Sequence, residues 1–179
     1  MDISENGIAL MEVVTMLIVK VFIEGIGLGF LLYLICAIGI RKGAIGMVHM
    51  YGNEVQKRVI ENGLTTAEEI KRRSLLFKCI CIPGYFIYVL VCAYMINGAR
   101  GFISGFWQMF VILSIMNLID RILVDGYWVG YTDDWEIPGT EDLKPYITSD
   151  DKKKKWIMGT VGMAVISAVL SGIMCLFFG

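Results

Sequence analysis

The chain has 179 residues, of which 56% are hydrophobic and 18% are charged. Soluble domains usually contain ~45–50% apolar and ~25% charged residues, so a water-soluble fold of this size could not bury this much apolar surface. The 16 basic and 17 acidic residues give a net charge of −1, which argues against a nucleic-acid-binding protein, because such proteins carry a basic surface. The composition therefore predicts an integral membrane protein.

Four apolar stretches predict an all-α fold with four transmembrane helices in a single domain, residues 1–179. Each stretch is close to the ~20 helical residues that cross a hydrocarbon core of ~30 Å. The predicted spans, joined by long loops at 41–78 and 121–156, are about 16–40, 79–97, 102–120 and 157–178. The flank before the first span contains no Lys or Arg, so we expect this span to be retained and not cleaved as a signal peptide.

Basic residues predict the orientation of the spans. All of the 16 basic residues except Lys20 and Arg100 fall in the two long loops. The positive-inside rule then places these loops in the cytoplasm and both termini outside, as in a multi-pass protein of the cell membrane. Interfacial aromatic residues are expected at the inner side (Trp128, Trp135, Trp156) and at the outer side (Trp107, Tyr94). The run Lys152, Lys153, Lys154 and Lys155 is expected to bind anionic inner-leaflet lipids, at ~1 kcal/mol per lysine.

Local signals predict a short cytoplasmic helical hairpin that leads into the second span. Asn53 and Gln56 match a helix N-cap and its reciprocal partner, and Gly63 matches a helix stop. A second helix is expected from Ala67, after two overlapping capping boxes, Thr65-x-x-Glu68 and Thr66-x-x-Glu69.

The loop 121–156 is expected to begin with a helix break near Gly126 and to end with a cap at Ser149 or Asp150. About 30 residues cannot form an independent core, so this loop must pack on the membrane face or on a partner.

Small residues predict close helix packing. Gly25-x-x-x-Gly29 lies in the first span, Gly101-x-x-x-Gly105 begins the third, and the fourth carries a stripe of Ala164, Ala168 and Gly172. Such residues let helix backbones approach in a membrane. The contacts are compatible with packing inside one chain, with a homo-oligomer or with a membrane-protein partner.

The first candidate site lies in span one. Lys20 and Glu24 are one helical turn apart, and ionisable residues within a span are costly unless they have a function or a partner. One interpretation is a Lys20–Glu24 pair at the outer rim. The other is a polar substrate site in the outer half of the membrane. Gln108 and Ser171 would belong to this site, because they lie at roughly the same depth as Glu24.

The second candidate site lies at the inner end of span three. Ser114, Asn117, Arg121 and Asp125 share one helical face, and Asp120 lies beside it. One interpretation is an interfacial belt with an Arg121–Asp125 pair; the other is a cytoplasmic pocket that holds a polar head group or a cation. Acids of the following loop could add oxygen ligands for Mg²⁺ or Ca²⁺, although their spacing does not match an EF-hand: Asp133, Asp134, Glu136, Glu141 and Asp142.

Missing motifs restrict the chemistry. The single histidine, His49, excludes a multi-histidine zinc site or a bis-histidine haem within one chain, and we interpret it as an interfacial side chain. The sequence has no phosphate-binding loop, no H-E-x-x-H motif and no G-x-S-x-G motif. We therefore expect no bound cofactor and no metal site, and buried free thiols for the five cysteines.

The sequence favours a small transporter or transport-accessory subunit with a polar intramembrane site on span one. Two alternatives stay open. One is a membrane enzyme that acts on a lipid-like substrate at the cytoplasmic face, and the other is a non-catalytic assembly or regulatory partner. No partner nucleic acid is expected.

Overall fold

The computed structural model describes residues 3–178, with side chains for residues 7–177. Within this range the chain is helical and contains no strand. The four long helices are α1 (Ile3–Ile40), α3 (Ala67–Leu90), α4 (Gly101–Ile119) and α6 (Ser149–Phe178). Two π-helical segments extend them: η2 (Val91–Ile96) after α3, and η3 (Asp120–Trp128) after α4. The short helices are η1 (Ala44–Met50), α2 (Asn53–Glu61), α5 (Val129–Tyr131), η4 (Asp133–Trp135) and η5 (Glu141–Leu143).

Four helical segments are long and apolar enough to cross a membrane, as the composition indicates. They are Gly7–Ile40, Ala67–Ile96, Gly101–Tyr131 and Ser149–Phe177. Each helix contains one of the four expected spans and continues beyond at least one of its ends, because the polar residues next to each apolar stretch are also helical.

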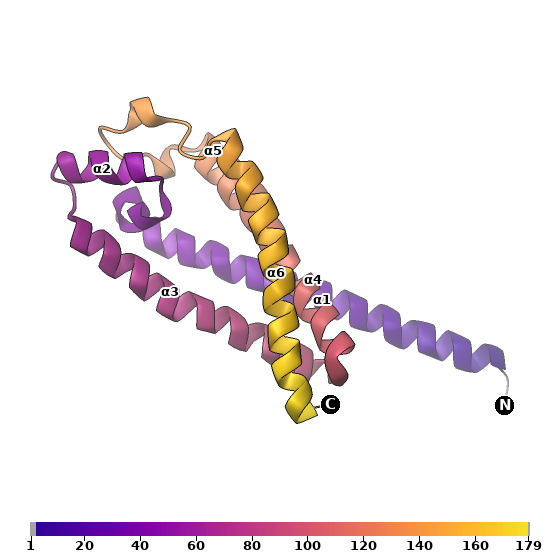
Figure 1. Cartoon of the computed structure of the whole chain (residues 1–179). Coiled ribbons are helices and arrows are strands. Elements are labelled where there is room, and N and C mark those ends of the chain that lie inside the picture. The colour runs from indigo at the N-terminus through magenta and orange to yellow at the C-terminus, as the bar shows by residue number, and fades with distance from the viewer. Residues whose placement is uncertain (1–2, 179) are drawn as a thin grey trace.

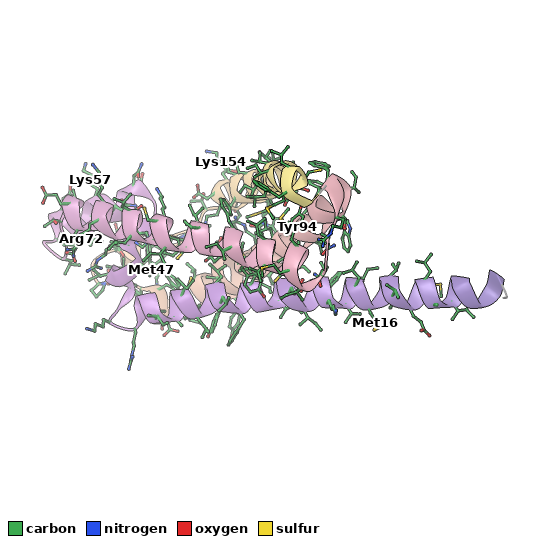
Figure 2. All side chains as sticks on the ribbon, turned by 90° about the horizontal axis from the view of Figure 1, so that it is seen from below. Met16, Met47, Lys57, Arg72, Tyr94 and Lys154 are labelled. Atoms are coloured by element: carbon green, nitrogen blue, oxygen red, sulfur yellow. The ribbon has the colours of Figure 1, made fainter. Side chains whose placement is uncertain are left out.

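The short elements lie together at one end of the molecule, and both termini lie away from them (Figure 1). We call the end that carries η1, α2 and the segment 132–148 the loop-bearing end. The labelled Lys57 and Arg72 lie at this end, whereas Met16 lies far along α1 in the opposite direction (Figure 2). Helix α4 is the centre of the bundle, since α1 and α6 both pack against it.

Glycines explain how closely α1 approaches α4. A Cβ atom on Gly25 would lie 2.8 Å from the Cβ atom of Ile115, and one on Gly29 would lie 3.1 Å from the Cβ atom of Ile119. Only glycine leaves room for these isoleucines. The Gly-x-x-x-Gly pattern of the first span therefore packs against another helix of the same chain.

Serines, and not the glycine of the small stripe, form the contact of α6 with α4. Ser167 and Ser171 are fully buried, and the Ser171 hydroxyl donates to the carbonyl of Phe102 at 2.6 Å. Gly172 is exposed, and a Cβ atom there would meet nothing within 4 Å. The contact therefore runs along the two serines beside the predicted stripe, and Gly172 of the stripe lies outside it.

The connection between α2 and α3 contains the helix stop at Gly63 and the N-cap at Thr66 that the sequence predicts. Gly63 has a φ of +70°, and the amide of Leu64 donates to the carbonyl of Val59 at 3.1 Å, which is the hydrogen bond of a Schellman stop. The Thr66 hydroxyl accepts from the amide of Glu69 at 3.2 Å, so α3 begins at Ala67 as expected.

The N-cap prediction for α2 is wrong, because Gly52 occupies the cap position. Asn53 is instead the first residue of α2, and the side chain of Gln56 donates to the carbonyl of Tyr51 at 2.8 Å. Helix α2 and helix α3 both pack on η1, which lies between the end of α1 and the start of α2.

Gly126 does not break the third long helix, contrary to the sequence prediction. The helix continues through the π-helical segment η3 and ends at Tyr131. A Cβ atom on Gly126 would lie 2.9 Å from the carbonyl oxygen of Arg121, so glycine permits the wide turn. Helix α6 is capped by Thr148 and not by Ser149 or Asp150: the Thr148 hydroxyl accepts from the amide of Asp151 at 3.2 Å.

The segment 132–148 packs on the segment around η1 and α2. The loop, which is too short for a core of its own, therefore packs on another part of the same chain. Trp135 is only 4% exposed, and its carbonyl accepts a hydrogen bond from the hydroxyl of Tyr51. The rings of Tyr51 and Tyr146 meet edge to face at 5.2 Å. Trp135 is therefore a core residue of this packed loop and not the interfacial anchor that the sequence suggested.

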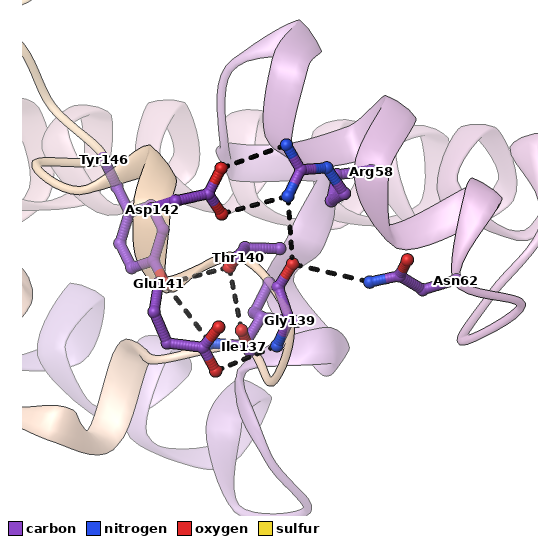
Figure 3. Close-up of polar contacts among 8 residues, drawn as sticks. All are labelled: Arg58, Asn62, Ile137, Gly139, Thr140, Glu141, Asp142 and Tyr146. Carbon is purple, nitrogen blue, oxygen red and sulfur yellow. Dashed lines mark hydrogen bonds and ion pairs between the residues drawn. The ribbon is translucent and has the colours of Figure 1, made fainter.

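A bidentate ion pair fastens the loop to α2 (Figure 3). The guanidinium of Arg58 contacts both carboxylate oxygens of Asp142, at 2.9 and 3.1 Å. Gly139 lies beside this pair with a φ of +81°, and a Cβ atom there would lie 2.6 Å from the side-chain nitrogen of Asn62. The turn thus requires glycine.

The acids of this loop hold the loop together. Glu136 pairs with Lys144, Asp134 accepts from the indole N–H of Trp128 at 2.8 Å, and Glu141 accepts from the amide of Gly139 at 2.9 Å. Among the residues that the structure describes, no group of three or more His, Cys, Asp or Glu side chains converges as a metal site would require. These contacts give the acids a structural role.

Candidate functional site

Charged side chains converge where the third long helix reaches the loop-bearing end. Asn117 ends the buried face of α4, and the π-helical segment η3 supplies the charged residues that follow it. The guanidinium of Arg121 donates to Asp125 at 3.0 Å and to the side-chain oxygen of Asn117 at 3.2 Å. The i, i+4 spacing of these three residues brings them onto one helix face, as the sequence predicts.

Helix α6 contributes a cation that the sequence analysis did not assign to this site. The ammonium of Lys155 donates to the same Asp125 oxygen at 2.9 Å. The carboxylate of Asp125 is therefore shared by two cations, Arg121 and Lys155. The side chain of Asp125 is only 12% exposed, so this contact is largely buried. We call Asp120, Arg121, Asp125 and Lys155 the charged cluster.

Asp120 differs from the other acid of the charged cluster. Its nearest cation within the described part of the chain is Arg121, 3.9 Å away, and its carboxylate forms no closer polar contact there. Its side chain is 25% exposed and lines a small cavity of about 50 Å³, next to Cys36 and Trp135. Asp120 is thus a carboxylate that is available to a cationic group.

Two larger hollows open on either side of this small cavity. One of about 620 Å³ is lined by Asp125, Lys152, Tyr131 of α5 and Tyr146 of the loop. The other, of about 450 Å³, is lined by Arg121, Lys154 and Lys155. Tyr146 and Ile147 line all three spaces, so the docked loop forms a common wall.

The aromatic wall includes residues that sequence reasoning missed. Tyr51 lines both the small cavity and the hollow around Lys154, and burial raises the pKa of its hydroxyl, with neighbouring Tyr146 adding to the effect. No spacing in the sequence links Tyr51 or Tyr146 to Asp120, because the contact depends on the docking of the loop. Ser114, the remaining residue of the predicted face, does not line any of the three spaces.

The charged cluster and Lys154 beside it offer two groups to a ligand. Arg121 and Asp125 are paired with each other, whereas within the described residues Asp120 has no cation closer than 3.9 Å and Lys154 is exposed. A carboxylate beside aromatic rings attracts a cationic group, and an exposed lysine attracts an anionic one. In the described chain, no serine, threonine or cysteine hydroxyl or thiol is hydrogen-bonded to a base of the charged cluster.

The polar residues of span one form a different arrangement from either interpretation of the sequence. A carboxylate oxygen of Glu24 accepts from the side-chain nitrogen of Asn97 at 2.9 Å, and the hydroxyl of Tyr88 donates to the backbone carbonyl of Glu24 at 2.9 Å. Lys20 is exposed and makes no ion pair with Glu24 in the described residues. The partner of Glu24 is thus an amide that follows the second span.

Gln108 and Ser171 do not join Glu24. Gln108 is buried, and its side-chain nitrogen donates to the hydroxyl of Ser104 at 3.3 Å, while Ser171 bonds at the contact of α4 with α6. None of the five hollows described at the surface of the chain is lined by Lys20, Glu24 or Gln108. The structure therefore brings Asn117, Asp120, Arg121 and Asp125 together, and leaves the three outer residues apart.

Comparison of the chain with protein-family models, with curated proteins and with solved structures found no match.

Proposed function

We propose that this chain is a four-span membrane protein whose loop-bearing end faces the cytoplasm and binds the polar head group of a lipid-like molecule. The observation that carries the proposal is the position of Asp120. It lies free of a close cation in a cavity between two larger hollows, at the level where the apolar helices meet the charged loops.

The charges on the two sides of Asp120 define the head group. Asp120 and the rings of Trp135 and Tyr51 provide a place for an amine. Lys154 lines the adjacent hollow and provides a place for a phosphate. A zwitterionic head group satisfies both, and its acyl chains can lie against the apolar surface of the bundle.

The experiment is native mass spectrometry of the protein purified in a mild non-ionic detergent. We expect the wild-type chain to retain a phospholipid that carries an amine, and Asp120→Asn to lose it. Glu68→Gln removes an exposed acid at the same end that lines none of the hollows, and it is the matched control, which should retain the lipid. Equal retention by Asp120→Asn would remove Asp120 from the proposal.

Three of the four lysines 152–155 have a further role in this proposal, as contacts to anionic lipids of the inner leaflet. Lys152, Lys153 and Lys154 are exposed at the start of α6, where they can reach lipid phosphates. Lys155 is bound to Asp125 and is therefore not available as a fourth contact.

A transport role is the second candidate, and the pair of Glu24 with Asn97 favours it. The side-chain oxygen of Asn97 is buried and without a hydrogen-bond partner, so a cation could be shared by this oxygen and the carboxylate of Glu24. We expect flux of a small cation into proteoliposomes to fall when Glu24 is changed to Gln, with Glu12→Gln as an exposed control on the same helix. Unchanged flux would remove Glu24 from transport.

A further inference from the structure

The only histidine of the chain lies in an unusual setting. His49 belongs to η1, and its ring packs against Phe77 of α3 with the ring centroids 5.3 Å apart. Both ring nitrogens are buried and lack a hydrogen-bond partner. Buried polar atoms of this kind are rare in folded proteins, because losing water without a replacement costs free energy. Two unpartnered nitrogens on one ring indicate a missing partner.

A hollow of about 450 Å³ adjoins His49 and is strongly basic. Lys71, Ser74 and Lys78 line it from α3, where the spacing i, i+3 and i+7 places them on one face. Gln56 contributes an amide from α2. We call this space the basic pocket; none of its lining residues is acidic.

Among the residues described, the two lysines of the basic pocket have no acidic partner, whereas the neighbouring Arg73 has one. Arg73 is bound to Glu69 and to the carbonyl of Ile45. Within the described residues, Lys71 and Lys78 form no ion pair. Glu68, three residues before Lys71, is exposed and does not line the basic pocket. Burial lowers the pKa of His49, and the charges of Arg73 and Lys78 lower it further. A negative group in the basic pocket would relieve this excess of positive charge.

The position of the basic pocket also matches an amphiphile. Its remaining walls are apolar, and they include Ile60 and Leu75. Leu75, Leu76 and Ile80 are exposed on α3, each by more than half, directly where this helix becomes apolar enough to cross a membrane. A phosphate in the basic pocket would therefore sit beside a surface that can accept acyl chains.

We propose that His49, Lys71, Ser74 and Lys78 bind a phosphate group, supplied either by the head group of an anionic phospholipid or by a soluble phosphate. The phosphate oxygens accept from the two ammonium groups and the serine hydroxyl, and the imidazole provides a further N–H donor. This binding site shares no residue with the charged cluster, so the loss of one leaves the other intact.

The single histidine makes the test specific. We would follow the imidazole ¹⁵N resonances of histidine-labelled protein in a maltoside detergent, which report on His49 without any assignment step. Dioleoyl phosphatidate, inorganic phosphate and, as a neutral reference, dioleoyl phosphatidylcholine are added separately. We expect phosphatidate to shift the resonances in a saturable way and phosphatidylcholine to leave them unchanged. A shift with inorganic phosphate as well identifies the soluble ion as a sufficient ligand, and its absence identifies the lipid as the source.

A paired variant separates binding from general charge. Lys71→Gln with Lys78→Gln should weaken phosphatidate binding about 30-fold, since each lysine–lipid contact near a membrane surface contributes ~1 kcal/mol and ~1.4 kcal/mol is a factor of ten. Lys42→Gln with Arg72→Gln removes the same charge from exposed positions outside the basic pocket and should change binding less than twofold. His49→Phe keeps the packing on Phe77 and should weaken retention of phosphatidate in native mass spectra. Equal weakening by both double variants, or His49 resonances that ignore phosphatidate, would overturn the proposal.

Discussion

Asp125 is the residue on which the charged cluster depends. Its carboxylate holds Arg121 from its own helix and Lys155 from α6, so it joins two long helices through one side chain. Removing the acid of a buried ion pair leaves its cations unpaired and typically costs about 3–5 kcal/mol. The sequence analysis identified Arg121 and Asp125 from helical spacing alone. It could not identify Lys155, because that contact depends on the approach of α6.

We expect Asp125→Asn to lower the midpoint of thermal unfolding in detergent by several degrees. Asp133→Asn changes an exposed acid without an ion pair and should leave the midpoint within experimental error. The measurement is tryptophan fluorescence during heating. An unfolding midpoint for Asp125→Asn equal to that of the wild type would show that the charged cluster does not join the helices.

A second residue-scale prediction concerns the docked loop. Hydrogen bonds and the charge of Arg58 hold the pKa of Asp142 below its ordinary value. An acid with a lowered folded-state pKa stabilises the docked state above its unfolded-state pKa of about 3.9, and this stabilisation is lost as the pH falls through the lower folded-state value. Asp142 therefore contributes fully near neutral pH.

We expect hydrogen-exchange protection of residues 137–143, corrected for the intrinsic effect of pH, to decrease as the pH falls below about 4. In Asp142→Asn the protection should already be reduced at pH 7, and it should change little with further acidification. Glu54→Gln, an exposed position on α2, serves as the control. Protection that is the same in Asp142→Asn and wild type at pH 7 would contradict a docking role for this ion pair.

At the scale of elements, glycines determine where α1 contacts α4 and allow the third long helix to continue beyond its predicted end. Gly25 and Gly29 allow the contact of α1 with α4, and Gly126 allows η3 to continue the third helix. The small-residue pattern correctly predicted the first of these. The prediction that the helix breaks at Gly126 was wrong. Glycine at this position leaves room for the carbonyl of Arg121 inside a π-helical turn, so the helix continues. Sequence signals for turns and for π-helical turns are similar, and only the backbone distinguishes them.

We expect Gly25→Ala to destabilise the bundle by about 1–3 kcal/mol, the usual cost of overpacking a close contact. The new Cβ atom would lie 2.8 Å from the Cβ atom of Ile115, which cannot rotate away. Gly172→Ala lies in α6 with nothing within 4 Å and should be neutral or slightly stabilising. Unfolding in mixed micelles of increasing SDS content measures both. Equal stability of the two variants would place the α1–α4 contact elsewhere.

At the scale of the whole molecule, composition already determined the class of fold. Apolar stretches of span length, separated by basic loops, leave few arrangements other than a helical bundle. The sequence could not show that the two long loops pack on each other, because this contact joins residues more than 80 positions apart, such as Arg58 and Asp142. The predicted site residues of span one, Lys20 and Glu24, line none of the five hollows described, and the binding sites proposed above lie at the loops instead.

The length of α1 has a consequence for the membrane. The segment Gly7–Ile40 has 34 residues, or about 51 Å at a rise of 1.5 Å per residue. This is longer than a hydrocarbon core of ~30 Å, so in the proposed four-span arrangement α1 would have to tilt or to extend beyond the bilayer.

The most direct test is the side of the membrane on which each end of the bundle lies. Single cysteines at Ile8 and at Asp133, both exposed, are introduced into a chain whose five native cysteines have been replaced by alanine. Intact cells are then treated with a membrane-impermeant maleimide, before and after permeabilisation. We predict that the cysteine at position 8 reacts in intact cells and that the one at position 133 reacts only after permeabilisation. Labelling of position 133 in intact cells, or recovery of the chain as a detergent-free soluble monomer, would contradict a four-span protein with its loop-bearing end inside.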